Sequence, residues 1–290
     1  MNVDVPRFHP LAGPYLDRRA EERETENWFD AALADEATRC IVAHRTAQLI
    51  HGDANAGDAP PRAALLHLRA LPPDVLQSDA AVLLGWYRGA RCVLLLTETP
   101  ERFADHGQFA ELRPLMATLD GEDAALLGYA RALSYWRLRH RFCGSCGART
   151  RPLKAGHVLR CSDADCSAEI FPRIDPAIIV LVTDPQAERA LLGRQPSWPP
   201  GRYSTIAGFV EPGESLEDAV AREVAEETGV RIAAARYDSS QPWPFPSSLM
   251  LGFRAVAAAG AQPRGGGELE DARWFTRAEI AAGAAVLPPP

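Results

Sequence analysis

The sequence has no long apolar run. No stretch approaches the roughly 18 consecutive apolar residues that a membrane-spanning helix needs, so we expect no transmembrane segment. A secretory signal peptide has a basic start followed by an apolar core, and residues 1–17 lack this pattern. No G-x-G-x-x-G pattern follows an expected strand, and this argues against a redox dinucleotide bound in a Rossmann fold. The absence of a signal peptide and of a transmembrane segment predicts a cytoplasmic protein.

The chain also lacks an excess of positive charge. It has 31 Lys and Arg against 38 Asp and Glu, a formal net charge of −7. A general electrostatic binder of nucleic acid usually shows a basic face, so this balance argues against one, although local patches still allow RNA ends as substrates. The hydrophobic fraction of 47% is typical of a soluble globular protein, and 290 residues are enough for two domains with their own cores.

Cysteine is scarce except in one place. Cys40 and Cys92 stand alone, whereas the other four of the six lie together, at Cys143, Cys146, Cys161 and Cys166. In a reducing compartment such a cluster indicates metal ligands rather than disulfides. Two short-spaced pairs can place four thiolates around one zinc ion, and a site closed by four thiolates is structural. The second pair is wider than the usual two-residue spacing, so we expect its turn to bulge.

Three regions can be separated along the chain. Residues 1–122 predict an N-terminal α+β domain, in which apolar strands 81–87 and 91–96 form a hairpin. Residues 123–173 predict a linking helix followed by the cysteine cluster. Residues 174–290 alternate strand and helix patterns, which is typical of a mixed sheet flanked by helices. There the strands 177–182 and 189–193 are expected to pair through a turn at Asp184-Pro185.

Four basic residues crowd the end of the expected linking helix. They are Arg137, Arg139, His140 and Arg141. Cations suit the carboxyl end of a helix because they complement its dipole. We interpret this group as a solvated helix end in preference to a phosphate contact.

The strongest pattern lies at residues 208–230. It begins as a loop that contains glycines and continues as a helix, for which Ser215 is the expected N-cap and Gly229 the expected end. Such a loop followed by a capped helix can present side chains at a defined place.

Three acidic residues of that helix fall three and four positions apart: Glu223, Glu226 and Glu227. Their carboxylates therefore crowd one helical face. Such crowding is costly unless cations fill the gap, and hard divalent ions such as Mg²⁺ take oxygen ligands. The bland alternative, a surface helix with solvated acids, leaves the spacing unexplained.

The whole pattern resembles the Nudix box. Its fixed positions are here Gly208, Glu214, Arg222, Glu223, Val224, Glu226, Glu227, Gly229 and Val230. The resemblance implies an α/β (α+β) protein, a Nudix α/β/α sandwich with a mixed sheet, preceded by a zinc ribbon and a smaller N-terminal α+β domain. It also implies hydrolysis of a nucleoside diphosphate linked to another group.

Roles follow from the same resemblance. It implies that Mg²⁺ or Mn²⁺ is held by Glu223, Glu226, Glu227, the further acid Glu268 and the carbonyl of Ala207. Arg222 and Glu214 then hold the loop and the helix in register. Glu226 or Glu227 orients or deprotonates the water that attacks phosphorus.

A second motif lies downstream, S-Q-P-W-P-F-P-S-S at residues 240–248. Its alternating prolines stiffen the backbone and fix where Trp243 and Phe245 point, which predicts an aromatic ledge for a flat base. The motif resembles the SQPWPFPxS signature of the NADH pyrophosphatase branch of the Nudix hydrolases, whose members also carry a four-cysteine zinc ribbon before the catalytic domain. The resemblance covers about residues 113–290.

This resemblance implies a set of dinucleotide contacts. They are Gln241, Pro242, Trp243, Pro244, Phe245, Pro246, Ser247 and Ser248, with Phe171 at an aromatic position and Arg113 by a looser match. The chain departs from the branch in two places. It has Gly156 where some members have a substrate-contacting glutamate, and it ends in three prolines where relatives continue into a last helix.

The resemblance therefore implies metal-dependent hydrolysis of NADH or NAD⁺ to nicotinamide mononucleotide and AMP, and removal of NAD caps from RNA 5′ ends. It implies a homodimer with one structural Zn²⁺ per chain and with NAD(H) as substrate. Two alternatives stay open: a Nudix hydrolase of another dinucleoside pyrophosphate, and a zinc-ribbon binding module whose hydrolase domain is dead. The intact run at residues 222–227 argues against the latter.

Overall fold

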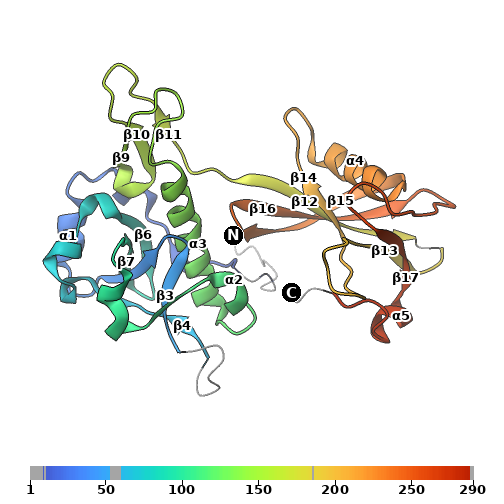
Figure 1. The fold of residues 1–290 in the computed structure, drawn as a ribbon, viewed down its shortest axis with the longest axis horizontal. Coiled ribbons are helices and arrows are strands. Elements are labelled where there is room, and N and C mark those ends of the chain that lie inside the picture. Colours follow the sequence, from blue (N-terminus) through green and yellow to red (C-terminus); the bar gives the residue numbers. More distant parts are fainter. Residues whose placement is uncertain (1–8, 10, 53–59, 185, 288–290) are drawn as a thin grey trace. The chain divides into compact units, whose positions relative to one another are not determined.

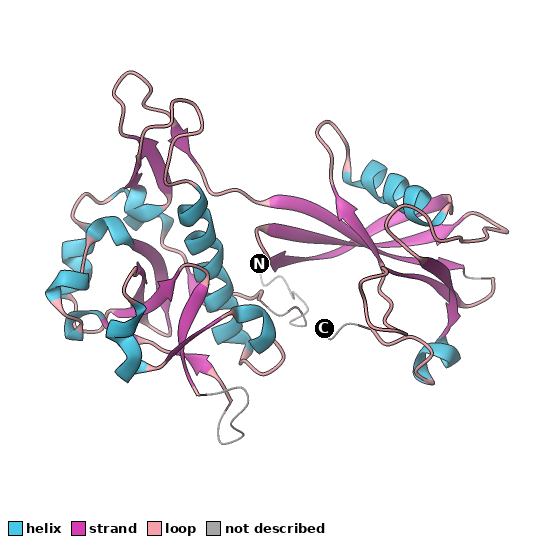
Figure 2. Cartoon of the chain, viewed as in Figure 1, coloured by secondary structure: helices cyan, strands magenta, loops and turns pink. Residues whose placement is uncertain are grey.

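The computed structural model describes residues 9, 11–52, 60–184 and 186–287. The three terminal prolines noted above lie outside these residues. The chain forms two compact units (Figure 1): Met1–Arg173 with Trp243–Ser247, and Ile174–Pro242 with Ser248–Pro290. Helices and strands both contribute to each unit (Figure 2). None of the described helices is long and apolar enough to cross a membrane.

The first unit is built on an eight-stranded mixed sheet, in the order β1-β6-β7-β2-β3-β4, with β5 paired to β2 and β8 to β3. The strands are β1 Leu16–Asp17, β2 Arg39–His44, β3 Ala47–His51, β4 Arg62–Ala63, β5 Leu66–His67, β6 Ala81–Tyr87, β7 Ala90–Leu96 and β8 Gln108–Ala110. The predicted hairpin is confirmed as β6 and β7. Its turn residues Arg88 and Gly89 have φ of 50° and 79°, as a tight hairpin turn requires.

Helices cover both faces of this sheet. They are η1 Ala20–Glu24, α1 Trp28–Ala34, η2 Leu68–Ala70, η3 Pro73–Val75, η4 Ser78–Ala80, η5 Pro100–His106, α2 Leu112–Leu115 and α3 Gly121–Arg139. Along β2, Ile41 and Ala43 belong to the core on the α3 side, whereas Cys40 and Val42 belong to the core that contains residues of α1. Side chains alternate between the faces of a strand, and residues 40–43 in the middle of β2 are all apolar because both faces are buried there.

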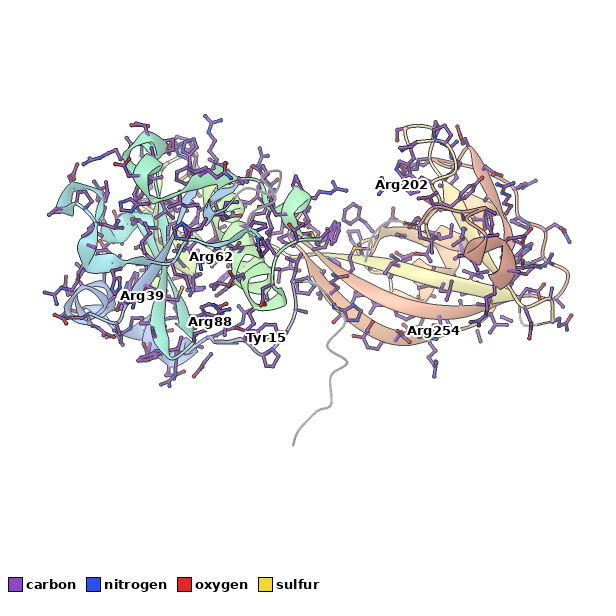
Figure 3. The ribbon with its side chains drawn as sticks, turned by 90° about the horizontal axis from the view of Figure 1, so that it is seen from below. Tyr15, Arg39, Arg62, Arg88, Arg202 and Arg254 are labelled. Carbon is purple, nitrogen blue, oxygen red and sulfur yellow. The ribbon has the colours of Figure 1, made fainter. Side chains whose placement is uncertain are left out.

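The helix α3 contributes to the apolar core on its side of the first unit's sheet. Its Leu126, Leu133 and Trp136 pack in the same cluster as the sheet, which goes beyond a linking role. At its start the buried Asp123 accepts hydrogen bonds from the Ala63 amide and the Tyr87 hydroxyl, both 2.8 Å away. Arg88, labelled in Figure 3, lies 3.5 Å from the same carboxylate. The domain boundaries at 122/123 and 173/174 stay a prediction.

The cysteine cluster lies on a small antiparallel sheet of the first unit. Its strands are β9 Thr150–Leu153, β10 Val158–Cys161 and β11 Glu169–Ile170, with the turn η6 Lys154–Gly156 between the first two.

The second unit contains a six-stranded mixed sheet, in the order β15-β16-β12-β13-β17, with β14 paired to β12. The strands are β12 Asp175–Asp184, β13 Arg189–Arg194, β14 Ile206–Phe209, β15 Ile232–Trp243, β16 Ser248–Ala257 and β17 Asp271–Thr276. The predicted antiparallel pairing of the first two is confirmed, with Val182 opposite Leu191. The strands β12 and β16 are parallel, a long-range pairing that local patterns do not predict.

A helix packs on each face of this second sheet. On one face α4 Leu216–Thr228 contributes Val220 and Val224 to a core that also contains Ile178. On the other, α5 Arg277–Ala281 contributes Ile280 beside a smaller cluster. A mixed sheet between helices is the fold class that the sequence predicted.

Candidate functional site

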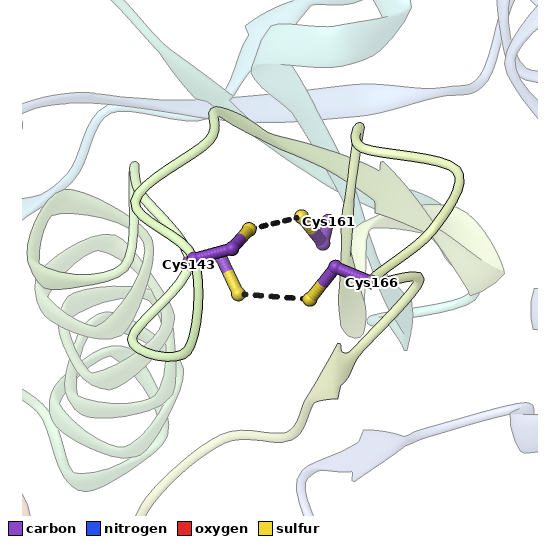
Figure 4. A group of neighbouring side chains, drawn as sticks. Cys143, Cys161 and Cys166 are labelled. Atoms are coloured by element: carbon purple, nitrogen blue, oxygen red, sulfur yellow. Dashed lines mark hydrogen bonds between the residues drawn. The ribbon is translucent and has the colours of Figure 1, made fainter.

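The four predicted cysteine ligands come together at the small sheet of β9, β10 and β11 (Figure 4). The Sγ atoms of Cys143 and Cys166 lie 3.8 Å apart, those of Cys146 and Cys161 lie 3.3 Å apart, and all four are within 4.8 Å of one another. Zn–S bonds of about 2.3 Å place the sulfurs of a tetrahedral site about 3.8 Å apart. The cluster therefore fits one zinc ion, and Cys166 belongs to it despite the wider spacing.

Local backbone groups hold the cluster in place. The Asp163 side chain accepts hydrogen bonds from the amides of Asp165 (2.9 Å) and Cys166 (3.3 Å), which stabilises the wider second turn. Backbone amides around Cys143 lower the pKa of its thiol to about 6, whereas burial raises the pKa of Cys161 to about 12. Four close thiolates repel one another, so the fully ionised cluster needs a cation.

Arg222 of α4 connects this helix to the loop that precedes it. Its guanidinium holds both carboxylate oxygens of Glu214, at 2.7 and 2.9 Å, and donates to the Phe209 carbonyl at 2.9 Å. The same group contacts Glu223 at 2.9 Å and the exposed Glu226 at 3.2 Å. The bonds from Arg222, and with them the Glu211 amide that donates to the same carboxylate at 3.0 Å, lower the pKa of Glu214 to about 2. Arg222 and Glu214 are both charged at neutral pH, and their ion pair orders the loop ahead of α4.

The caps of α4 are those that the sequence predicted. The Ser215 hydroxyl accepts a hydrogen bond from the Asp218 amide at 3.1 Å, and Gly229 ends the helix with φ of 69°. These two caps fix the ends of the helix that carries Glu223, Glu226 and Glu227.

Gly208 is needed because of Glu223. A Cβ atom built on Gly208 would overlap the carboxylate of Glu223, which packs directly on the glycine backbone. The preceding residue, Ala207, lies on β14 opposite Ile179. Strand β14 thus brings its backbone against the acidic side of α4 at this point.

The acidic residues of α4 repel one another. Burial and the charges of Glu223, Glu268 and Glu226 raise the pKa of Glu227 to about 7. The loop that carries Glu268 is fixed against the end of α4, where the Arg264 amide donates to the Thr228 carbonyl at 3.0 Å. Burial contributes most to this rise in pKa and the three neighbouring charges add to it, so a divalent cation with oxygen ligands would relieve the repulsion.

The aromatic ledge belongs to the first unit. Trp243 and Phe245 pack against the core cluster of that unit, and their rings form an edge-to-face pair with centroids 5.2 Å apart. Arg131 of α3 donates to the Pro244 carbonyl, and its Cζ lies 4.8 Å from the centroid of the Phe245 ring. Both rings remain half-buried, so the segment combines packing with partial exposure.

The other predicted substrate residues lie around this segment in the chain or on separate elements. Gln241 and Pro242 lie just before Trp243, the last residue of β15, and Ser248 begins β16. Phe171 follows β11 with 61% of its surface exposed, and Arg113 lies exposed on α2.

Gly156 cannot simply be replaced by the glutamate of some relatives. Its φ is +88°, and a Cβ there would lie 2.8 Å from the Ala81 carbonyl oxygen and 2.9 Å from a methyl carbon of Val82. The close approach of this turn to β6 therefore requires glycine.

Arg131 is a residue that the sequence analysis did not single out. It is buried in α3, where burial lowers its pKa, and it lies 3.7 Å from Glu111. One signal was present: Arg131 is the only charged residue in the stretch 124–136. A lone cation in an apolar helix indicates a specific partner.

Comparison with family models divides the chain in three. Residues 173–289 match the NUDIX domain, residues 138–171 match the NADH pyrophosphatase zinc ribbon domain, and residues 37–136 match the NADH pyrophosphatase-like rudimentary NUDIX domain. The last match identifies a region in which the sequence motifs had indicated nothing beyond structure.

Curated relatives share long stretches with the chain. The NAD-capped RNA hydrolase NudC of Pseudomonas syringae pv. syringae (strain B728a) is 41% identical over 251 residues, which cover 86% of each chain. The protein of the same name from Stutzerimonas stutzeri (strain A1501) is 48% identical, over 66% of this chain and 68% of the relative. Nudix hydrolase 19, chloroplastic, of Arabidopsis thaliana is 47% identical over 61% of this chain, but the match spans only 43% of that longer relative.

Proposed function

Because the chain belongs to the Nudix hydrolases of the NADH pyrophosphatase type, with their zinc ribbon, we propose that it hydrolyses the pyrophosphate of NADH and NAD⁺. The products are the nicotinamide mononucleotide and AMP. On RNA whose 5′ end carries NAD, the same reaction removes the cap. NAD(H) is the substrate here and not a redox cofactor.

The observation that carries this proposal is the set of contacts around Arg222. This one side chain binds Glu214 through both carboxylate oxygens and also reaches Glu223. The loop and the helix are therefore held together, and the acids are ordered before any substrate binds. Such preorganisation is the main protein contribution to phosphoryl transfer.

The catalytic metal is Mg²⁺ or Mn²⁺ in this proposal. Its ligands are Glu223, Glu226, Glu227, Glu268 and the carbonyl of Ala207. When bound, such an ion neutralises the charge of the pyrophosphate oxygens and lowers the pKa of a coordinated water.

The protein's own residues then act on water and substrate. Glu226, with 61% of its side chain exposed, accepts the proton of the attacking water or orients it, and Glu227 shares this role. Arg222 and Glu214 keep the helix in register with the loop. The segment Gln241–Ser248, with Phe171 and Arg113, contacts the dinucleotide, and the accessible parts of Trp243 and Phe245 offer surfaces for a flat base.

The test is an assay of products. The purified protein is incubated with NADH and Mg²⁺ or Mn²⁺, and AMP and the nicotinamide mononucleotide are separated chromatographically. NAD⁺, NAD-capped RNA and other dinucleoside pyrophosphates are run beside it. A higher kcat/KM for another dinucleoside pyrophosphate would replace the proposed substrate. No hydrolysis of any of them would identify a catalytically dead binding module.

Three further features belong to this proposal. One Zn²⁺ per chain occupies the cysteine cluster as a structural ion, the protein is a homodimer, and it works in the cytoplasm. Elemental analysis measures the zinc content, light scattering after gel filtration measures the mass in solution, and cell fractionation locates the protein.

A further inference from the structure

The zinc ribbon, residues 138–171, is basic in a chain that is acidic overall. Residues 138–171 contain six basic residues and three acidic ones, whereas the whole chain carries a net charge of −7. The six are Arg139, Arg141, Arg149, Arg151, Lys154 and Arg160. The charge of the whole chain therefore says little about the partners of this part.

Several of these cations already have partners. Lys154 lies 2.9 Å from Glu24, and Arg160 donates to Glu169 at 3.2 Å. In contrast, the side chains of Arg149 and Arg151 form no ion pair with any residue that the structure describes. Both are exposed. Positive charge is thus available on the ribbon surface.

The strand register gathers these residues on one side. Arg151 of β9 lies directly opposite Arg160 of β10, and Arg149 is two residues before Arg151, so all three side chains project from the same face. Phe142 is bridged to Arg149 and joins this face. We call Phe142, Arg149, Arg151 and Arg160 the ribbon face. Glu169 of β11 lies opposite Arg160 on the same face and pairs with it, which leaves the charges of Arg149 and Arg151 for a bound anion.

An aromatic ring accompanies the charges. Phe142 is 55% exposed, and the guanidinium of Arg149 lies over its ring, with Cζ 5.4 Å from the centroid. Cations that reach phosphates beside an exposed ring on which a base can stack are the usual means of binding single-stranded nucleic acid. An acidic protein partner would use the cations but has no need of the ring.

We propose that the ribbon face binds single-stranded RNA, through its phosphates at Arg149 and Arg151 and through base stacking on Phe142. The significance of this contact for capped RNA rests on the proposed function, because the RNA would be the body of the substrate. The binding itself requires no hydrolysis and is tested on uncapped RNA.

The deciding variant is Arg149→Glu with Arg151→Glu in the full-length protein. Its matched control is Arg45→Glu with Arg62→Glu, which makes the same charge change at two exposed positions of the same unit; Arg62 is labelled in Figure 3. The probe is a fluorescently labelled, uncapped, single-stranded oligoribonucleotide, and anisotropy measures its dissociation constant across a series of salt concentrations.

We expect the ribbon variant to weaken binding at least about tenfold at low salt, and the control less than about twofold. Losing two phosphate contacts reduces the slope of log K against log salt by about 1.4. Arg149→Lys with Arg151→Lys should retain most of the affinity, since the charge is kept. Phe142→Ala should cost about tenfold with the salt slope unchanged, because stacking involves no counterions.

Other outcomes overturn the proposal. Equal losses in the ribbon variant and the control would show a general effect of net charge, and no loss in either would show that RNA binds elsewhere or not at all. Polyglutamate that competes as well as RNA would identify a surface for acidic proteins.

Zinc content and kcat/KM on NADH should stay within about twofold of wild type in the ribbon variant. If its zinc is lost, Arg149→Gln with Arg151→Gln decides instead. Should the wild type fail to hydrolyse NADH, the proposed function is wrong, while the RNA measurement still decides this inference.

Discussion

The guanidinium of Arg131 lies over the ring of Phe245, its Cζ 4.8 Å from the ring centroid, and the same side chain donates to the carbonyl of Pro244. Both contacts lie within the first unit, which includes Trp243–Ser247. The proline-stiffened segment is consequently positioned by a partner as well as by its own backbone.

This relationship sets the first prediction. Phe245→Ala removes a half-buried ring and its contact with Arg131, and should reduce the free energy of unfolding by about 2 kcal/mol in urea denaturation. Losing either Phe245 or Trp243 should also lower kcat/KM on NADH about ten- to a hundredfold, because stacking contributes about 1–3 kcal/mol per base.

The control for this prediction is a small pyrophosphate ester without the nicotinamide half. Its hydrolysis should fall much less, since the acidic residues are untouched. Equal losses on both substrates would mean that the segment only supports the fold, and the substrate assignment would return to a generic Nudix hydrolase.

Gly208→Ala should abolish most activity while the protein stays folded. The new Cβ would occupy the place of the Glu223 carboxylate, which must move. We expect kcat to fall about a hundredfold or more with a far-UV circular dichroism spectrum like that of the wild type. Gly144→Ala is the matched control, because nothing lies within 4 Å of a Cβ built there. Normal turnover in Gly208→Ala would contradict the role of this packing.

Glu227→Gln tests the metal assignment directly. A neutral amide replaces a ligating carboxylate of almost the same shape, so the fold should persist and turnover should fall by several orders of magnitude. Steady-state kinetics on NADH measures this. If more than about a tenth of the wild-type kcat remains, Glu227 does not hold the metal.

The zinc prediction concerns stability. Cys146→Ser, or chelation, should lower the thermal midpoint by several degrees without removing a catalytic group, because a closed four-thiolate site stabilises the ribbon. Ser145→Ala, at an exposed residue of the same turn that is not a ligand, keeps the metal and serves as control. Freshly purified, reduced protein without about one zinc per chain would rule the assignment out.

The raised pKa of Glu227 predicts a pH dependence for the metal-free protein. The folded state holds the proton up to about pH 7, whereas the unfolded chain releases it near the ordinary value of 4.5. The folded state therefore binds more protons between these values, and this group reduces stability as the pH rises through that window.

Thermal denaturation at several pH values, in buffer prepared without added Mg²⁺ or Mn²⁺, measures the effect. The downward trend should be weaker in Glu227→Gln, and Mg²⁺ should restore stability most at the alkaline end, where the carboxylate is free to bind it. The same slope in Glu227→Gln and in the wild type would show that other groups cause it.

Much of the site was determined by the sequence itself, because its parts are local. The spacing of Glu223, Glu226 and Glu227 follows from helical periodicity, and the caps at Ser215 and Gly229 lie within one turn of the helix ends. The cysteine pairs likewise lie on two short turns. In these cases a few neighbouring residues contain the physical cause.

The tertiary structure decided what depends on distant partners. Arg131 meets Phe245 across more than a hundred residues, β12 pairs with β16 in parallel, and the arginines of the ribbon share one face through strand register. No local pattern encodes such contacts, because the hydrophobic pattern of a helix or strand is the same whichever partner it packs against. Packing selects the partner, by burying apolar surface and pairing the polar groups that burial would otherwise leave unsatisfied.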